Sequence, residues 1–190
     1  MTDLFSFILV MVSLVLAIGV THLVQGVADI VRRRGTVRVE PLQLAWAAAL
    51  FLVAALYWWS LWDLRAAEWR FPLFFGMLLA PTLLHIAASL LVSTDGDEAG
   101  PGAAFEQIRV PFMVVMALFS VVVMLDGWAV GSETTWWTVY RPIQLWTVGL
   151  YGAGAVLGGA RAQRAIAGLA LATYVAAGFV FRLLPGAFGS

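Results

Sequence analysis

The chain has 190 residues, of which 62% are apolar and only 12% are charged, and its mean hydropathy is +0.92. Soluble domains carry about 25% charged residues, and a sphere this small could not hide so much apolar surface from water. Lipid is therefore the expected solvent, and a formal net charge of zero favours no nucleic acid as a partner. The chain contains no cysteine, which excludes disulfides, thiolate metal ligands and cysteine nucleophiles.

Six stretches are long and apolar enough to cross a bilayer core about 30 Å thick as helices. They are residues 4–30, 42–62, 72–93, 108–130, 137–160 and 164–184. Four prolines are each expected in a first helical turn, where a missing N–H is tolerated: Pro41, Pro72, Pro111 and Pro142. The connections are short, which predicts a single all-α transmembrane domain over residues 1–190, a polytopic bundle of about six helices.

Arginine placement in the short connections sets the expected orientation. Arg32, Arg33, Arg34, Arg38, Arg109, Arg161 and Arg164 fall on one side of the membrane, and Arg65, Arg70, Arg141 and Arg182 fall on the other. The side with more arginines is predicted to be cytoplasmic, which places both termini outside. Because all eleven basic residues are arginine, we interpret the composition as bacterial and expect a multi-pass protein of the inner membrane.

Most tryptophans fall near the predicted outer boundary. They are Trp58, Trp59, Trp62, Trp69, Trp128, Trp136 and Trp137. Indole rings favour the headgroup layer, because the ring prefers apolar contact and its N–H prefers a polar partner. An interfacial belt is one interpretation, and an outward aromatic pocket for an apolar or cationic ligand is the other.

A polar stripe is predicted on the first span. Polar side chains inside a membrane are costly, so each calls for a partner or a function. At 100° per residue, His22, Gln25 and Asp29 lie on one face. Asp29 can pair with Arg32 or Arg33 along the helix.

The third span contains a proline and a histidine close together. Pro81 removes the hydrogen bond to the carbonyl of Met77, so a kink is predicted there, with Thr82 helping to satisfy the freed group. His85 stands one turn further on, at the expected depth of His22. We predict that the two histidines share a polar cavity; proton passage, haem ligation and simple hydrogen bonding to a neighbouring helix all fit such a pair.

Four charged residues are expected at the outer ends of four different spans. They are Asp63, Asp126, Arg141 and Arg182. Opposite charges at equal depth can pair at lower cost than either alone. We expect Asp126 to meet Arg141 across the turn between the fourth and fifth spans, as a structural staple.

No motif names a reaction, so we expect no enzyme activity, no metal site and no resident cofactor. The leading hypothesis is a small channel or transporter for an ion or small molecule, with its pathway along His22, Gln25, Asp29 and His85. A homo-oligomer is expected, since one chain of this size has little room for a central pore. One alternative is a haem-binding redox subunit that uses the two histidines. Another is a membrane sensor or accessory subunit without transport activity.

Overall fold

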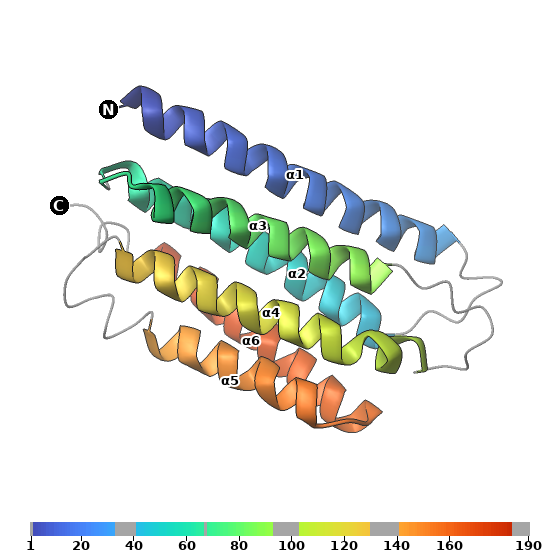
Figure 1. Ribbon diagram of the computed structural model, residues 1–190. Helices are drawn as coiled ribbons and strands as arrows, with labels where there is room; N and C mark the ends of the chain where they lie inside the picture. The colour runs from blue at the N-terminus through green and yellow to red at the C-terminus, as the bar shows by residue number, and fades with distance from the viewer. Residues whose placement is uncertain (1, 33–40, 67, 93–102, 130–140, 184–190) are drawn as a thin grey trace.

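The computed structural model describes residues 2–32, 41–66, 68–92, 103–129 and 141–183, and these residues are helical almost throughout. The helices are α1 (Thr2–Arg32), α2 (Pro41–Ser60), α3 (Phe71–Val92), α4 (Ala103–Ala129), α5 (Arg141–Val156) and α6 (Ala160–Leu183), with the 3₁₀ helix η1 (Leu61–Ala66) after α2. The predicted all-α fold of six helices is confirmed. Successive helices run in opposite directions, so α1 begins and α6 ends at the same end of the bundle (Figure 1).

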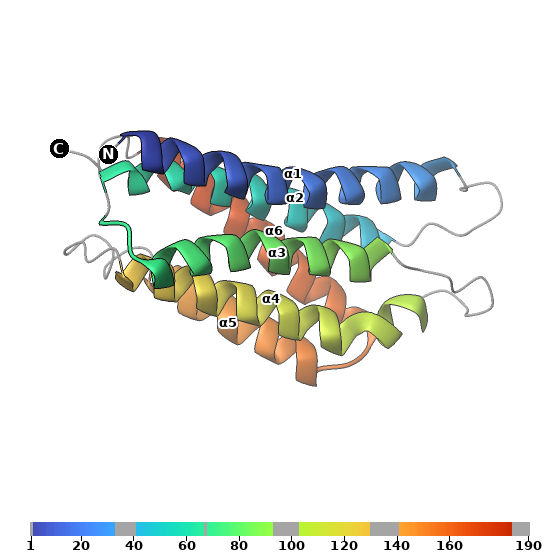
Figure 2. The same cartoon turned by 45° about the horizontal axis from the view of Figure 1, so that its top comes forward.

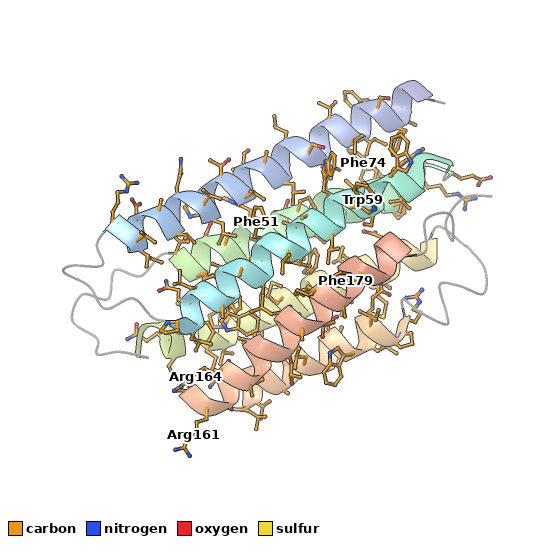
Figure 3. The ribbon with its side chains drawn as sticks, turned by 180° about the vertical axis from the view of Figure 1, so that it is seen from behind. Phe51, Trp59, Phe74, Arg161, Arg164 and Phe179 are labelled. Atoms are coloured by element: carbon orange, nitrogen blue, oxygen red, sulfur yellow. The ribbon has the colours of Figure 1, made fainter. Side chains whose placement is uncertain are left out.

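The six helices form two layers. In the front layer α1, α3, α4 and α5 lie side by side in that order, and α2 and α6 cover this layer from behind (Figures 1 and 2). We call the end where α2 stops, with Trp58 and Trp59, the tryptophan end. The opposite end, with Arg161 and Arg164 at the start of α6, is the arginine end (Figure 3). The core between the layers is mostly apolar.

Four helices are long and apolar enough to cross a membrane within the described residues. They are Leu4–Arg32, Pro41–Ser60, Phe71–Val92 and Phe105–Gly127. Large apolar side chains also cover the outside of the bundle: Phe51, Trp59 and Phe179 are 50%, 64% and 60% exposed (Figure 3). A monomeric protein in water rarely exposes so much apolar surface, so this exterior suits lipid.

The last two helices differ from the predicted spans. α5 has 16 residues, about 24 Å of helix at 1.5 Å per residue, which is shorter than expected for residues 137–160. Residues 137–140 lie outside the described residues. At its other end the helix stops at Val156, just before a turn in which Gly159 has a φ of +95°, a conformation that glycine adopts at low cost. α6 then begins at Ala160, earlier than expected.

Arginines tie α4 and α5 together at both ends. Near the arginine end, Nη1 of Arg109 on α4 donates to the carbonyls of Gly154 and Ala155 at 3.0 and 2.5 Å. Near the tryptophan end, Nη1 of Arg141 on α5 donates to the carbonyl of Met124 on α4 at 2.7 Å. Gly154 and Ala155 are among the last four residues of α5, whose carbonyls lack partners within the helix and carry a partial negative charge that favours a cation. The two arginines together make a reciprocal clamp.

The start of α4 corrects one sequence expectation. The helix begins at Ala103 and not near residue 108, so Pro111 lies inside it and not in its first turn. The early turns are supported by an ion pair between Glu106 and Arg109, three residues apart, with 2.8 Å between Oε1 and Nε. Because Arg109 also holds the end of α5, the helix is anchored before the proline is reached.

Two glycines let α1 approach α3 closely. A Cβ atom at Gly19 would lie 3.3 Å from the Cα of His85, and one at Gly26 would overlap the methyl groups of Val92. Both glycines are buried and stand seven residues apart on the same face of α1. Because lipid gives no hydrophobic drive for helix association, such close backbone contact is a main source of adhesion between helices.

Replacing Gly26 with leucine should therefore loosen α1 from α3. Overpacking of a well-packed contact costs about 1–3 kcal/mol. The side chain of Val92 is short and branched, so it cannot swing aside. We expect a clearly lower midpoint of thermal unfolding in detergent. The matched control is Gly168→Leu on α6, where an added Cβ meets nothing within 4 Å. Equal losses from the two substitutions would contradict the close α1–α3 contact.

Candidate functional site

A cavity of about 150 Å³ lies inside the bundle, toward the tryptophan end. Its wall comes from α2, η1, α3, α4, α5 and α6, and α1 takes no part in it. We call it the Asp126 cavity. Its polar lining consists of Tyr57, Ser60, Ser120, Asp126, Gln144, Thr147 and Tyr174. The rest of the lining is apolar and includes Val53, Met77, Phe119, Val123 and Ala177.

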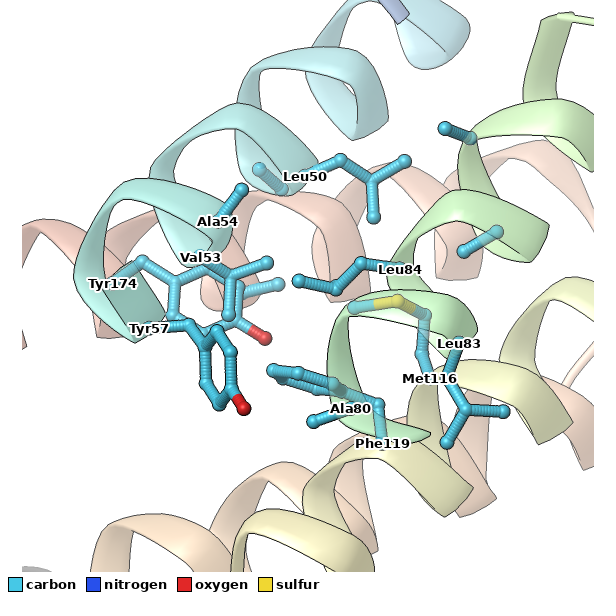
Figure 4. Packing of buried hydrophobic residues seen from close by; sticks show 14 of the residues in the cluster. Leu50, Val53, Ala54, Tyr57, Ala80, Leu83, Leu84, Met116, Phe119 and Tyr174 are labelled. Carbon is cyan, nitrogen blue, oxygen red and sulfur yellow. The ribbon is translucent and has the colours of Figure 1, made fainter. Parts of the chain in front are cut away.

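Aromatic rings form one part of this wall. Tyr57 on α2 and Phe119 on α4 meet edge to face, with ring centroids 6.0 Å apart and planes at 69°. Tyr174 enters from α6, and its hydroxyl is hydrogen-bonded to the hydroxyl of Tyr151 on α5. Figure 4 shows Tyr57, Phe119 and Tyr174 converging from these three helices. Edge-to-face packing of this kind holds rings in fixed positions, so the wall is pre-formed.

The carboxyl group of Asp126 reaches from α4 to α3. A Cβ atom at Gly76 would overlap Asp126 Oδ1, so the missing side chain at Gly76 makes room for the carboxyl. Asp126 Oδ2 is buried and has no hydrogen-bond partner among the described residues, and the same holds for Oε1 of Gln144 on α5. Both residues line the cavity. Two buried acceptors without donors, on residues that line one cavity, are unusual in a folded protein.

Pro81 is connected to this cavity through Met77. α3 continues as a helix through Pro81, and the Met77 carbonyl, which Pro81 leaves without an intrahelical donor, accepts a hydrogen bond from the Tyr57 hydroxyl at 2.9 Å. Thr82 was expected to help there, but its hydroxyl donates to Leu78 at 2.8 Å. The partner of the Met77 carbonyl is therefore Tyr57 on α2, and the sequence of α3 alone could not have indicated it. The expected bend at Pro81 stays a prediction.

His22 and His85 lie together, as their depths predicted. Their ring centroids are 5.7 Å apart with planes at 70°, and both side chains are partly buried. The Nδ1 atom of His85 is buried and has no hydrogen-bond partner among the described residues. A hollow of about 10 Å³ between α1, α2 and α3 has an apolar lining, and neither histidine contributes to it. The described cavities thus do not include the shared polar space that we predicted.

The rest of the predicted stripe faces outward. Gln25 is exposed, and Asp29 forms an exposed ion pair with Arg32, with 2.8 Å between Oδ1 and Nη2. Asp29 therefore pairs with Arg32, one of its two predicted partners. Gly19 lies against the backbone of His85, so the two histidines meet where α1 and α3 are in close contact. Haem ligation by this pair stays a prediction.

The predicted outer charge network is only partly described. The side chains of Asp63 and Arg182 lie outside the described part of the structure. Among the described ion pairs none joins Asp126 to Arg141; the guanidinium of Arg141 holds the carbonyl of Met124, and Asp126 Oδ2 has no partner. The expected staple is corrected for a geometric reason: Asp126 Oδ1 lies against Gly76 on α3, and Nη1 of Arg141 is bonded to the Met124 carbonyl.

The described tryptophans at the tryptophan end do not line the Asp126 cavity. Trp58, Trp59 and Trp62 are 48%, 64% and 62% exposed at the tryptophan end, and none of them lines the Asp126 cavity. Trp128, Trp136 and Trp137 have side chains outside the described part. Trp69 is half-buried and packs on Phe5. For the three exposed tryptophans the belt is the better interpretation, and the aromatic groups of the pocket are tyrosine and phenylalanine.

Comparison with protein-family models, with curated proteins and with solved structures gives no match to this chain. Function must therefore be argued from the site. Sequence reasoning singled out Asp126, but it missed the hydroxyl groups of Tyr57, Ser120, Thr147 and Tyr174. These hydroxyls also lie inside apolar helices, and the cost of a polar group in lipid applies to them as it does to charges. That signal was present in the sequence.

Proposed function

We propose that this chain is a membrane transport protein that binds its substrate in the Asp126 cavity. The observation that carries the proposal is a pre-formed cavity of about 150 Å³ with two buried, unpartnered oxygens on its wall. Side chains that line such a space lack packing partners on one side, which lowers stability. Such a cost is hard to explain unless the space has a use, and ligand sites are typically apolar hollows with a few polar groups.

The place of Pro81 supports transport over static binding. The carbonyl that Pro81 leaves without a backbone donor belongs to Met77, and both Met77 and its donor Tyr57 line the cavity. A proline break is where a membrane helix bends most easily. A change in bend would therefore move one wall of the cavity and one of its hydrogen bonds together.

The membrane location rests on the four apolar helices and the apolar exterior. We propose a multi-pass protein of a bacterial inner membrane with the arginine end facing the cytoplasm and both termini outside, because of the arginine counts. The natural chain has no cysteine, so single cysteines report their own side cleanly. An impermeant maleimide should label Gly131→Cys and not Gly35→Cys on intact cells. Labelling of Gly35→Cys from outside would reverse the orientation.

The other functional hypotheses gain less from the structure. A pathway along α1 and α3 would need Gln25 and Asp29 to face a shared space, and both are exposed on the outside of α1. The Asp126 cavity is formed within one chain, so the proposal does not depend on a homo-oligomer. A sensor or accessory subunit could use the same cavity for binding alone, and a flux measurement separates that case.

The test is uptake by liposomes that contain the purified full chain. The probes are radiolabelled benzylammonium and benzoate, because a cavity of about 150 Å³ is large enough for a benzene ring. We expect one of them to enter faster than in protein-free liposomes, and we expect Ala177→Leu, which extends a side chain into the cavity, to abolish the excess. Uptake of neither probe above the protein-free rate would sink the transport proposal.

A further inference from the structure

We infer that the ligand of the Asp126 cavity is a small organic cation with several N–H groups, a primary ammonium or a guanidinium on a body no larger than a benzene ring. This inference rests on the proposed function, since it names the substrate class of the same site. It follows from the direction of the hydrogen bonds that four wall hydroxyls make and from two acceptors that lack donors.

Four of the hydroxyl groups on the wall donate to backbone carbonyls. Tyr57 donates to Met77 at 2.9 Å, and Ser60 donates to the carbonyl of Tyr57 at 2.7 Å. Ser120 donates to Met116 at 3.0 Å, and Thr147 donates to the carbonyl of Gln144 at 2.8 Å. A hydroxyl has one proton and two lone pairs. Once the proton is used within the wall, only the lone pairs remain for a ligand. These hydroxyls are therefore acceptors toward the cavity.

The two unpartnered atoms are acceptors as well. Oδ2 of Asp126 and Oε1 of Gln144 come from α4 and α5 and line the same space. A buried acceptor without a donor is costly, and the cost is larger for a carboxylate than for an amide. A ligand that removes both costs must donate at least two hydrogen bonds, and a positive charge would balance the carboxylate. A neutral donor meets only the first need, and an anion meets neither.

The aromatic wall is compatible with the same charge. Tyr57 and Phe119 hold their rings edge to face, so the ring planes lie at 69° and present faces as well as edges. The face of an aromatic ring attracts a cation within about 6 Å of its centre. The volume of about 150 Å³ limits the body of the ligand to roughly one aromatic ring. Charge, hydrogen-bond direction and size thus select one chemical class.

The experiment compares three ligands that share a benzene ring and differ in charge. Benzylammonium, benzyl alcohol and benzoate are titrated into the full chain in lipid nanodiscs at pH 7, and binding is followed by calorimetry. We expect benzylammonium to bind about 10- to 100-fold more tightly than benzyl alcohol, the effect of a charged hydrogen bond over a neutral one, and benzoate to bind most weakly. This comparison needs no variant, so it does not depend on whether a variant folds.

Variants then assign the effect to atoms. Asp126→Asn should reduce benzylammonium affinity to that of benzyl alcohol, and Gln144→Met should lower it several-fold. The matched control is Asp29→Asn, which removes an exposed carboxylate at the arginine end and should change nothing. Equal binding of alcohol and ammonium, or an unchanged affinity in Asp126→Asn, would overturn the cation inference. If benzyl alcohol binds and Ala177→Leu blocks it, the cavity stands as a site and only the charge assignment fails. If none of the three binds, both fail.

Discussion

Tyr57→Phe should destabilise the native chain strongly, yet have little effect in a chain that also carries Pro81→Ala. In the native protein the Tyr57 hydroxyl is the donor for the Met77 carbonyl. Removing it leaves a buried carbonyl without a partner, at a cost of about 1–3 kcal/mol. Alanine at position 81 restores a backbone N–H that can donate to Met77 along the helix. The second substitution should therefore cancel most of the damage from the first.

The measurement is a four-protein cycle of unfolding free energies: the native chain, each single variant and the double variant. We expect an interaction free energy of about 1–2 kcal/mol between the two positions, well above the few tenths seen for independent sites. Thr82→Val is a useful comparison, because its hydroxyl donates to Leu78 and should not couple to Tyr57. Additive losses at positions 57 and 81 would show that the tyrosine does not stand in for the missing backbone donor.

Ala177→Leu should raise stability and reduce uptake in the same protein. Ala177 is buried and lines the Asp126 cavity, so a leucine there extends three further carbon atoms into open space. Filling a cavity restores dispersion contacts that its lining lacks, and a gain of about 1–2 kcal/mol follows from the volume occupied. The same atoms occupy the space of a ligand, so binding and liposome uptake should both be lost.

The matched control is Ala176→Leu, one residue earlier on the same helix and exposed. It adds the same atoms to α6 on a face turned away from the cavity, and both stability and uptake should stay near the native values. A leucine at position 177 that stabilises without affecting uptake would locate the substrate elsewhere. If Ala177→Leu instead lowers the stability, the space is too small for the added carbon atoms, and the cavity is not a pre-formed ligand site.

Much of the architecture could be read from local sequence. Apolar runs between turn residues predicted six helices, and prolines at positions 41, 72 and 142 marked starts to within a residue or two. Depth along the helices was also predictable, because each residue adds a fixed rise; for this reason His22 and His85 were correctly expected at one level. These properties depend on one helix at a time.

The site depended on which helices become neighbours, and short-range pattern does not contain that information. Asp126 was paired with Arg141 because the two are close in sequence, whereas the carboxyl instead lies against Gly76, fifty positions earlier. Thr82 was assigned to Met77 for the same reason, and the donor proved to be Tyr57 on α2. The cavity itself results from six packed segments. Only the rule that polar groups in lipid need a partner pointed toward the cavity. That rule was applied to charged residues and not to hydroxyl groups, so most of the polar lining was missed.

The reciprocal clamp between α4 and α5 restricts how the protein can change shape. Arg109 holds the end of α5 and Arg141 holds α4 near its end, so these two helices are fastened at both extremities and should behave as one rigid body. α5 is also joined to α6 by side-chain hydrogen bonds, between Trp146 and Thr173 and between Tyr151 and Tyr174. A change of shape that alters the Asp126 cavity should therefore move α4 and α5 together, because both helices line it.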